Sequence, residues 1–412
     1  MTRPAACLSV SLAALALAAL SCARPARAPQ VTEIVFWESW PTAVVAPIVA
    51  DFERGHPGLR VRVERFEGEA GAARIRAAVA ADSVPDLCQA GAALMPGLLA
   101  GGKLADWSAG VADLRPALRG WELCSMGDAL YGVPWVLDSR ALFYDRTLLE
   151  RARPGPARPP ATWDELDRAA AAVQRRGHGA HGYGLPVADS SMLATQVLSF
   201  VAAGGGSVLS PDLRRAVFDS AANVKALQFL LGLRRAGRVA SQDALERDFV
   251  AGRLAFLMAG PRLVEALRRE SPGLRYGVAP VPRPARDTLA GVAWAAGEVL
   301  VSFNASKRKH LALDLARFLV EPANALRLAE ALQVVGPATV GAETAGYFRA
   351  RPARAAMVRQ LAGARFAPNH PAWAAMQSVI AGEAGLALRD RKSAAQAVRD
   401  AQARLVVLVG KR

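Results

Sequence analysis

Strand-like and helix-like segments alternate along the first part of the chain, and this order constrains the fold more than any single motif does. An apolar stretch that begins at Val31 is followed by a helical pattern at 42–55, an alternating strand pattern at 59–66 and a small-residue helical pattern at 69–82. A further short apolar run, "VPDLCQAG", ends in glycine. Strands that alternate with helices in units of about 30 residues form mostly parallel sheets, whose ligands gather beyond the carboxyl ends of the strands. The sequence therefore predicts an α/β fold with a binding site where such strands end.

The chain begins with a short leader. An arginine precedes an apolar run at 8–20, which is followed by Cys22 and a spacer rich in Pro, Ala and Arg. The run is shorter than the ~18 residues that a membrane-spanning helix needs, so it indicates a secretory signal peptide. We expect a signal peptide at 1–21, a spacer at 22–30 and a lipid anchor on Cys22, in the periplasm or on the outer face of the cell membrane. Cleavage a few residues later, without a lipid, is the alternative.

The formal net charge of +15 on 412 residues is typical of proteins that bind nucleic acid or anionic membranes. Most of the basic residues are nevertheless single arginines spaced along helix-like segments, as on solvated helix faces. The densest block spans 349–365 and contains five arginines, no acid and no aromatic residue. A nucleic-acid groove would interleave aromatic residues with the charges. The block therefore indicates a basic surface, and we expect no nucleic-acid partner.

Two further cysteines, Cys88 and Cys124, belong to the expected mature chain. Disulfides form and persist in the oxidising compartment that a secretory leader implies. Cys88 and Cys124 could therefore be paired, although the sequence does not tell whether their Cα atoms come within bonding range.

Motifs of catalysis, cofactor binding and metal binding fail on their context. The stretch "GHGAHG" at 177–182 has the spacing of a dinucleotide fingerprint, but it follows a helix and precedes a strand, the reverse of what that site requires. The chain contains no G-x-S-x-G and no H-E-x-x-H. We therefore expect no catalytic residues, no cofactor and no metal. One enzyme interpretation stays open, a glycosidase that uses Glu38 and Asp138 as its acid and base.

Six segments occur in a characteristic order between residues 33 and 319, namely "EIVFWESW", "GGKLADWS", "YGVPWVLDSRALFYD", "PATWDEL", "DFVAGRLAFLMAGP" and "VSFNASKRKHLALDLARFL". In this order they resemble the extracellular solute-binding proteins of ABC importers, in the sugar-binding lipoprotein group that includes maltose-binding protein. The resemblance implies two α/β lobes, a hinge of crossing strands and a ligand cleft between the lobes. It implies that lobe 1 spans 31–138, lobe 2 spans 139–287, the chain returns to lobe 1 at 288–330, and 331–412 are mainly helices of lobe 2.

The resemblance also implies where the ligand binds. In the family, the end of the first strand contributes to the ligand site, so Glu38 and Trp40 are candidates there. Trp37 is a further candidate that could instead belong to the core. Asp138 matches the position of a sugar-binding carboxylate, with a structural role in the hinge as the alternative. Gln89, in the turn "PDLCQAG", supplies another polar group.

Three candidates come from later segments. Trp294 in "GVAWAAGE" and Trp373 in "HPAWAAM" match family positions where an aromatic ring stacks on the sugar. Arg262 in "MAGPRL" stands where family members often carry an aromatic residue. Because a guanidinium forks onto phosphate or carboxylate, this departure favours a charged sugar or sugar phosphate, unless Arg262 points to solvent.

The expected function is capture of a carbohydrate and its delivery to the permease subunits of an ABC importer, by a protein that acts as a monomer. A binding subunit that signals to a sensor and a secreted carbohydrate-active enzyme are the alternatives. The sequence does not name the sugar.

Overall fold

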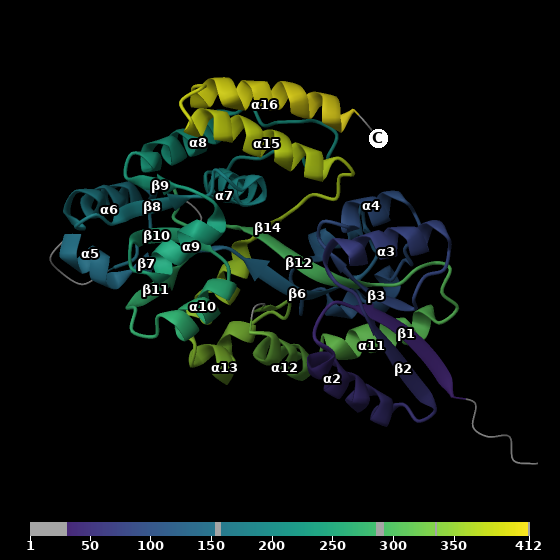
Figure 1. The fold of residues 1–412 in the computed structure, drawn as a ribbon. Coiled ribbons are helices and arrows are strands. Elements are labelled where there is room, and N and C mark those ends of the chain that lie inside the picture. Colours follow the sequence, from purple (N-terminus) through teal and green to yellow (C-terminus); the bar gives the residue numbers. More distant parts are fainter. Residues whose placement is uncertain (1–30, 153–157, 286–291, 334–335, 411–412) are drawn as a thin grey trace, which may run out of the picture.

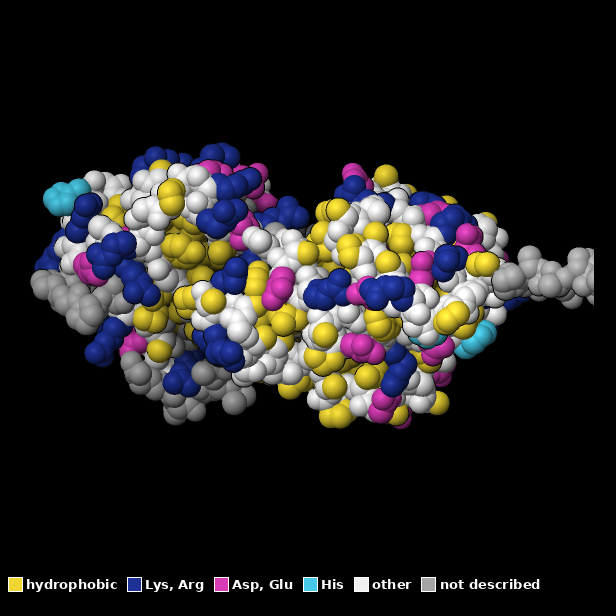
Figure 2. Space-filling view, turned by 90° about the horizontal axis from the view of Figure 1, so that it is seen from below, with side chains coloured by type: hydrophobic (Ala, Val, Ile, Leu, Met, Phe, Trp, Pro, Cys, Tyr) yellow, Lys and Arg dark blue, Asp and Glu magenta, His cyan; other side chains and the backbone are white. Residues whose placement is uncertain are grey.

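The computed structural model describes residues 31–152, 158–285, 292–333 and 336–410. The described chain forms two lobes, each built around its own β-sheet with helices packed on it (Figure 1). Figure 2 shows the lobes as two masses joined at a narrower waist. The expected α/β fold with two lobes is confirmed. The expected signal peptide, the spacer and Cys22 lie outside the described residues.

The first lobe contains a seven-stranded sheet. Its strands run in the order β13-β6-β12-β3-β1-β2, and β14 pairs with β12. Their bounds are β1 (Thr32–Glu38), β2 (Leu59–Arg65), β3 (Leu87–Gly91), β6 (Val133–Ser139), β12 (Trp294–Val301), β13 (Gly336–Pro337) and β14 (Arg365–Phe366). Strand β1 is parallel to β2 and β3, as the alternation of strands and helices predicts, whereas β12 is antiparallel to both β3 and β6. Strand β12, which comes late in the sequence, therefore lies in the interior of the first sheet, between β3 and β6.

The second lobe contains a five-stranded sheet in the order β11-β7-β10-β8-β9. Its strands are β7 (Ala141–Asp145), β8 (His181–Leu185), β9 (Gly237–Val239), β10 (Leu254–Ala259) and β11 (Tyr276–Ala279). Every residue of β7 and β10 is buried. Both strands have continuous apolar runs instead of alternating ones, because helices cover both faces of such a sheet. A separate hairpin pairs β4 (Ser125–Met126) with β5 (Ala129–Leu130).

Helices surround both sheets. Those of the first lobe are α2 (Thr42–Gly55), α3 (Gly68–Ala80), α4 (Met95–Ala100), α11 (Lys309–Leu319), α12 (Pro322–Leu332) and α13 (Gly346–Arg349). Those of the second lobe are α5 (Arg146–Ala152), α6 (Trp163–Arg176), α7 (Ser190–Ala203), α8 (Ala221–Arg234), α9 (Gln242–Val250), α10 (Arg262–Glu270), α15 (Trp373–Leu388) and α16 (Ala394–Val409). Helix α6 begins with the predicted capping box, in which Thr162 and Glu165 satisfy each other's backbone N–H groups. The helix start is therefore specified locally.

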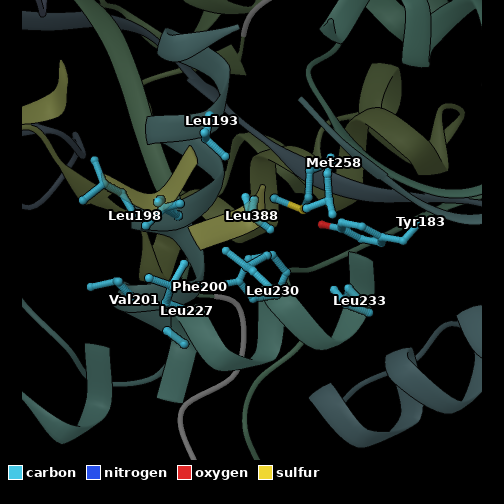
Figure 3. Packing of buried hydrophobic residues seen from close by; sticks show 14 of the residues in the cluster. Tyr183, Leu193, Leu198, Phe200, Val201, Leu227, Leu230, Leu233, Met258 and Leu388 are labelled. Atoms are coloured by element: carbon cyan, nitrogen blue, oxygen red, sulfur yellow. The ribbon is translucent and has the colours of Figure 1, made fainter. Parts of the chain in front are cut away.

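Each lobe has its own hydrophobic core. In the second lobe, Leu198 and Phe200 of α7 meet Leu227 and Leu230 of α8 and Leu388 of α15 (Figure 3). The last two helices, α15 and α16, thus return to the second lobe, beside α7 and α8 (Figure 1).

The return of the chain to the first lobe is longer than expected. Strand β13 pairs with β6, and Phe348, Val358 and Leu361 are buried in the core of the first lobe. Residues 336–361, which we expected among the helices of lobe 2, therefore pack largely on lobe 1. The sequence pattern could not show this, because a helix looks the same whichever sheet it covers.

Helix α14 (Pro352–Gln360) lies at the hinge and touches both lobes. Its Val358 enters the first core, whereas its Met357 enters a core cluster of the second lobe. The chain crosses between the sheets at Arg140, where the Gln360 amide donates to the Arg140 carbonyl (2.6 Å). The Gln360 side-chain oxygen also accepts from the N–H of Val281 (2.8 Å). This helix therefore ties the crossing strand to the second lobe.

The disulfide considered between Cys88 and Cys124 is not present, because both cysteines are free and buried. The Cys88 thiol donates to the Gln89 carbonyl (3.3 Å), and the Cys124 thiol donates to the Gly132 carbonyl (3.4 Å). Burial raises the pKa of both thiols. Both cysteines therefore act as small core residues. Within the described part of the chain, no helix has the length and apolar character to cross a membrane.

Candidate ligand-binding site

A cavity of about 580 Å³ lies between the two lobes. The first lobe contributes Trp40 and the turn at 91–93, and the crossing strands β6 and β12 contribute 136–138 and 296–298. The second lobe contributes residues from α7, α9 and the loop before α10. A cavity with walls from both lobes and a floor of crossing strands can enclose a small ligand when the lobes close.

Two buried polar side chains accept hydrogen bonds from the backbone of the turn that follows β1. The backbone N–H of Trp40 donates to the Glu38 carboxylate (2.5 Å), and the N–H of Ser39 donates to the Gln89 side-chain oxygen (2.9 Å). Glu38 and Gln89 are almost completely buried, and neither is among the described residues that line the cavity. Both side chains therefore position Trp40, and of the three residues it is Trp40 that faces the cavity.

Trp37 points away from the cavity. Its ring is buried in the core of the first lobe, and the guanidinium of Arg74, on α3, lies over it at 3.7 Å. Side chains on a strand alternate between its two faces, so neighbouring residues of β1 cannot share a surface. Trp37 thus occupies the core position that the sequence left open.

Asp138 lies in the cavity at the end of the crossing strand β6. Its Oδ1 atom is buried and has no hydrogen-bond partner among the described residues. Burial raises the pKa of Asp138 to about 6, and the positive charges of Arg140 and Arg262 oppose this shift. A buried polar atom without a partner is costly, so a ligand hydroxyl that reaches Oδ1 would recover that free energy.

Glu298, on β12, is a cavity residue that the sequence did not single out. Burial raises its pKa to about 7, and the neighbouring Gln89 side chain opposes the shift. Glu298 ends the stretch "GVAWAAGE", in which attention falls on Trp294 as the aromatic residue. Glu298 follows the small residues Ala295, Ala296 and Gly297, and this local pattern does not distinguish it from a surface glutamate.

Arg262 stands at the first turn of α10 and lines the cavity with Arg140. The described lining also includes five acids, which outnumber these two arginines. They are Asp138, Asp189, Asp243, Glu246 and Glu298. Sequence reasoning missed Asp189 because it is also the N-cap of α7, where its carboxylate accepts from the N–H of Met192 (3.0 Å). The cavity is therefore acidic on balance.

The other two tryptophans lie together but outside this cavity. The rings of Trp294 and Trp373 stack with their centroids 5.5 Å apart and an angle of 23° between their planes. They line a smaller hollow of about 170 Å³ together with Arg365 and residues of α7. Trp373 is buried in the core of the second lobe. In this structure the two indoles stack on each other, so they are not brought together with Trp40 and Asp138.

Among the described residues, no group of His, Cys, Asp and Glu side chains has the arrangement of a metal site. The polar side-chain groups that line the cavity are carboxylates, guanidinium groups, the Gln242 amide and the Trp40 indole N–H, which can hydrogen-bond to a ligand directly.

Comparison with known proteins decides the family. Residues 47–356 match the family of bacterial extracellular solute-binding proteins, which is more than half of the chain. The chain belongs to this family. A binding protein of Brucella abortus (strain 2308) is 29% identical to this solute-binding protein in an alignment of length 287 that covers 65% of this chain and 67% of the relative.

Solved structures agree with the family. The sugar-binding protein MalE from Xanthomonas citri superposes with a TM-score of 0.84 at 26% identity, over 92% of this chain and 98% of MalE. The cyclic alpha-maltosyl-1,6-maltose binding protein from Arthrobacter globiformis has the same TM-score at 21% identity, over 92% of this chain and 100% of that protein. The resemblance to solute-binding proteins of ABC importers is confirmed.

Proposed function

We propose that this solute-binding protein captures a neutral carbohydrate between its lobes and delivers it to the permease of an ABC importer. The observation that carries the proposal is the interlobe cavity, in which Trp40 faces carboxylates from the crossing strands and the second lobe. The CH faces of a sugar stack on an indole, and its hydroxyls need oriented hydrogen-bond partners. The cavity offers both kinds of contact.

The charge of the cavity favours an uncharged sugar over a sugar phosphate. The five acids that line it outnumber Arg140 and Arg262, and both arginines act on Asp138. A phosphate group placed here would meet like charges at close range, which costs free energy. The guanidinium of Arg262 is then available to donate to sugar hydroxyls beside Asp138.

The relatives support a carbohydrate ligand. Besides the two proteins above, a solute-binding protein of Thermotoga lettingae was crystallised with alpha-D-tagatose, with a TM-score of 0.73 at 22% identity. Closure of two lobes around a ligand stabilises one conformation, which a membrane partner can recognise. Anchoring through a lipid on Cys22, in the periplasm or on the outer face of the membrane, is part of the same proposal.

The proposal is tested by a panel of ligands in calorimetric titration and thermal unfolding. We expect at least one neutral mono-, di- or oligosaccharide to bind and to raise the melting temperature, because a ligand bound only by the folded state stabilises it. Sugar phosphates are expected to bind more weakly than the matching neutral sugars. Binding of a sugar phosphate alone, or of no sugar at all, would overturn the assignment of a neutral carbohydrate.

Matched variants then locate the site. Trp40→Ala removes the stacking ring and Asp138→Asn removes the carboxylate charge, and each is expected to weaken sugar binding by about tenfold or more, which is about 1.4 kcal/mol. Trp37→Phe is the control, since its ring lies outside the cavity under Arg74. Equal loss of affinity in the Trp37 variant would mean that Trp40 does not act by contact.

The enzyme and sensor alternatives are separated by simple outcomes. Glu38 does not line the cavity, so it cannot act with Asp138 on one substrate there. Asp138 and Glu298 do share the cavity and both have a raised pKa, so analysis of the products after incubation with the sugar tests the enzyme alternative. We expect the bound sugar to be recovered unchanged. Loss of sugar uptake in cells that lack the gene, measured with labelled ligand, would distinguish transport from sensing.

A further inference from the structure

A second cavity, of about 690 Å³, lies on the second lobe between β11, α10 and the start of α14. None of the described residues that line it lines the interlobe cavity. The charged residues in its described lining are one acid, Glu265, and five arginines, Arg146, Arg268, Arg351, Arg354 and Arg359. Figure 2 looks onto the side of the molecule that α10 and α13 form, where Lys and Arg side chains are spread over the second lobe. The charge of this cavity is therefore opposite to that of the sugar site.

The single described acid of the cavity is already engaged. One oxygen of Glu265 pairs with Arg354 Nη2 (3.1 Å), and the other pairs with Arg268 Nε (3.1 Å). Arg354 is only 4% exposed, so the Glu265–Arg354 ion pair forms a fixed part of the cavity wall. Glu265 thus pairs with two of the five arginines, Arg268 and Arg354.

The remaining three arginines keep their charge uncompensated. Among the described residues, Arg146, Arg351 and Arg359 have no acidic partner. The guanidinium of Arg351 lies over the Tyr347 ring at 4.1 Å, and that of Arg146 lies over the Tyr144 ring at 5.8 Å. Arg351 Nη1 also donates to the Tyr347 carbonyl (3.2 Å). An aromatic face orients a guanidinium, so the other N–H groups of Arg351 can still donate to a ligand.

The start of α14 adds backbone donors to these charges. The helix has nine residues, Pro352 occupies its first turn, and no side chain caps its N-terminus. Pro352 has no N–H, and the N–H of Ala355 donates to the Arg351 carbonyl (3.0 Å), so the backbone donors left at this end are those of Ala353 and Arg354, which both line the cavity. A helix N-terminus carries a partial positive charge and favours oxyanions.

We propose that this cavity binds a small multivalent oxyanion of the phosphate class, at a site separate from the sugar site. Arg351 and Arg359 donate in pairs to the oxygens, as guanidinium groups do with phosphate, while Arg354 and Glu265 hold the wall in shape. The size of the cavity accommodates a ligand larger than inorganic phosphate. The anion therefore contacts helix α14 of the hinge and helix α10 of the second lobe together.

Calorimetric titration of the full chain with pyrophosphate, at fixed ionic strength, tests the proposal. We expect saturable binding to one site. The double variant Arg351→Gln/Arg359→Gln should weaken that binding by at least about tenfold. Both side chains are exposed, so the variant is expected to fold, which an unchanged melting temperature without ligand would verify. The control Arg168→Gln/Arg175→Gln removes the same charge from the exposed face of α6 and should bind as the unmodified chain does.

Absence of saturable binding, or equal affinity in both double variants, would overturn the proposal. The source of the phosphate group is distinguished with dihexanoyl-phosphatidylglycerol below its micelle concentration. Tighter binding of this monomeric lipid than of pyrophosphate, lost in the Arg351/Arg359 variant, would assign the site to a lipid headgroup. Tighter binding of pyrophosphate would assign it to a free anion.

Discussion

The carboxylate of Glu38 accepts a hydrogen bond from the backbone N–H of Trp40, two residues along the chain, at 2.5 Å. The contact turns the chain sharply after β1 and sets the direction in which the Trp40 ring leaves the backbone. Glu38 is completely buried, and its second oxygen has no partner among the described residues. We therefore expect this acid to affect ligand binding through the position of Trp40.

We predict that Glu38→Ala weakens sugar binding by about tenfold and lowers the free energy of unfolding by about 1–3 kcal/mol, because a buried N–H loses its acceptor. Glu38→Gln keeps an oxygen in the same place and should retain most of the affinity. Calorimetric titration and denaturant unfolding measure the two effects. If the Gln variant loses affinity as the Ala variant does, the charge of Glu38 matters and the positioning role is wrong.

The raised pKa of Glu298 predicts how stability depends on pH. The folded protein keeps the proton on Glu298 up to about pH 7, whereas the ordinary value for a glutamate is 4.5. Between these values the unfolded chain binds fewer protons, so the free energy of unfolding falls as the pH rises through this window and levels off above it. Glu38, whose pKa burial also raises to about 7, contributes in the same direction.

Glu298→Gln removes one of these titrations. We expect the variant to have a higher melting temperature than the unmodified chain at pH 8 and the same one near pH 4.5, measured by calorimetry without ligand. Glu330→Gln, on the exposed face of α12, is the matched control and should leave the pH dependence unchanged. Parallel curves for the Glu298 variant and the unmodified chain would contradict the prediction.

The two buried thiols predict a chemical signature. Cys88 and Cys124 should resist alkylation in the folded protein, because both are buried and burial raises the pKa of each thiol above its ordinary value. After unfolding without a reductant, both should react, and peptide mass spectrometry should find each one modified. Peptides that carry Cys88 and Cys124 joined by a disulfide would show that the pair forms after all.

Removal of the capping box at the start of α6 is expected to lower the stability of the protein. The Thr162 hydroxyl accepts from the N–H of Glu165, so Thr162→Ala should lower the free energy of unfolding by about 1 kcal/mol. Ser378→Ala, within α15, removes an exposed hydroxyl that bonds only to its own helix and should change stability by less than about 0.5 kcal/mol. Similar losses in both variants, measured by urea unfolding, would argue against a special role for the cap.

Local sequence patterns were sufficient to predict several elements of the fold. The periodicity of 42–55 and 59–66 matches α2 and β2, and the Thr162 capping box marks the start of α6. These features depend on neighbouring residues, so they can be predicted without tertiary contacts. The placement of 336–361 on the first lobe depends on which sheet a helix covers, and periodicity carries no information about that.

The candidate site divides in the same way. Sequence motifs singled out Trp40, Asp138 and Arg262, which line one cavity, and also Trp294 and Trp373, which stack on each other elsewhere. Glu298 was missed because nothing in its immediate neighbourhood distinguishes it from a surface glutamate. Its pKa is raised by burial in a sheet where β12 inserts between β3 and β6, and β12 begins more than 150 residues after β6 ends.

The sequence by itself determined the α/β class, the family and the residue types at the end of β1, because hydrophobic periodicity, caps and ordered motifs are local properties of the chain. Only the tertiary structure decided that Trp40 faces the cavity while Trp37 enters the core, that the cavity is acidic, and that Arg146 and Arg268 join Arg351 and Arg359 around a second cavity. Each of these outcomes depends on the direction of a side chain relative to segments far away in the sequence, and that direction is set by packing.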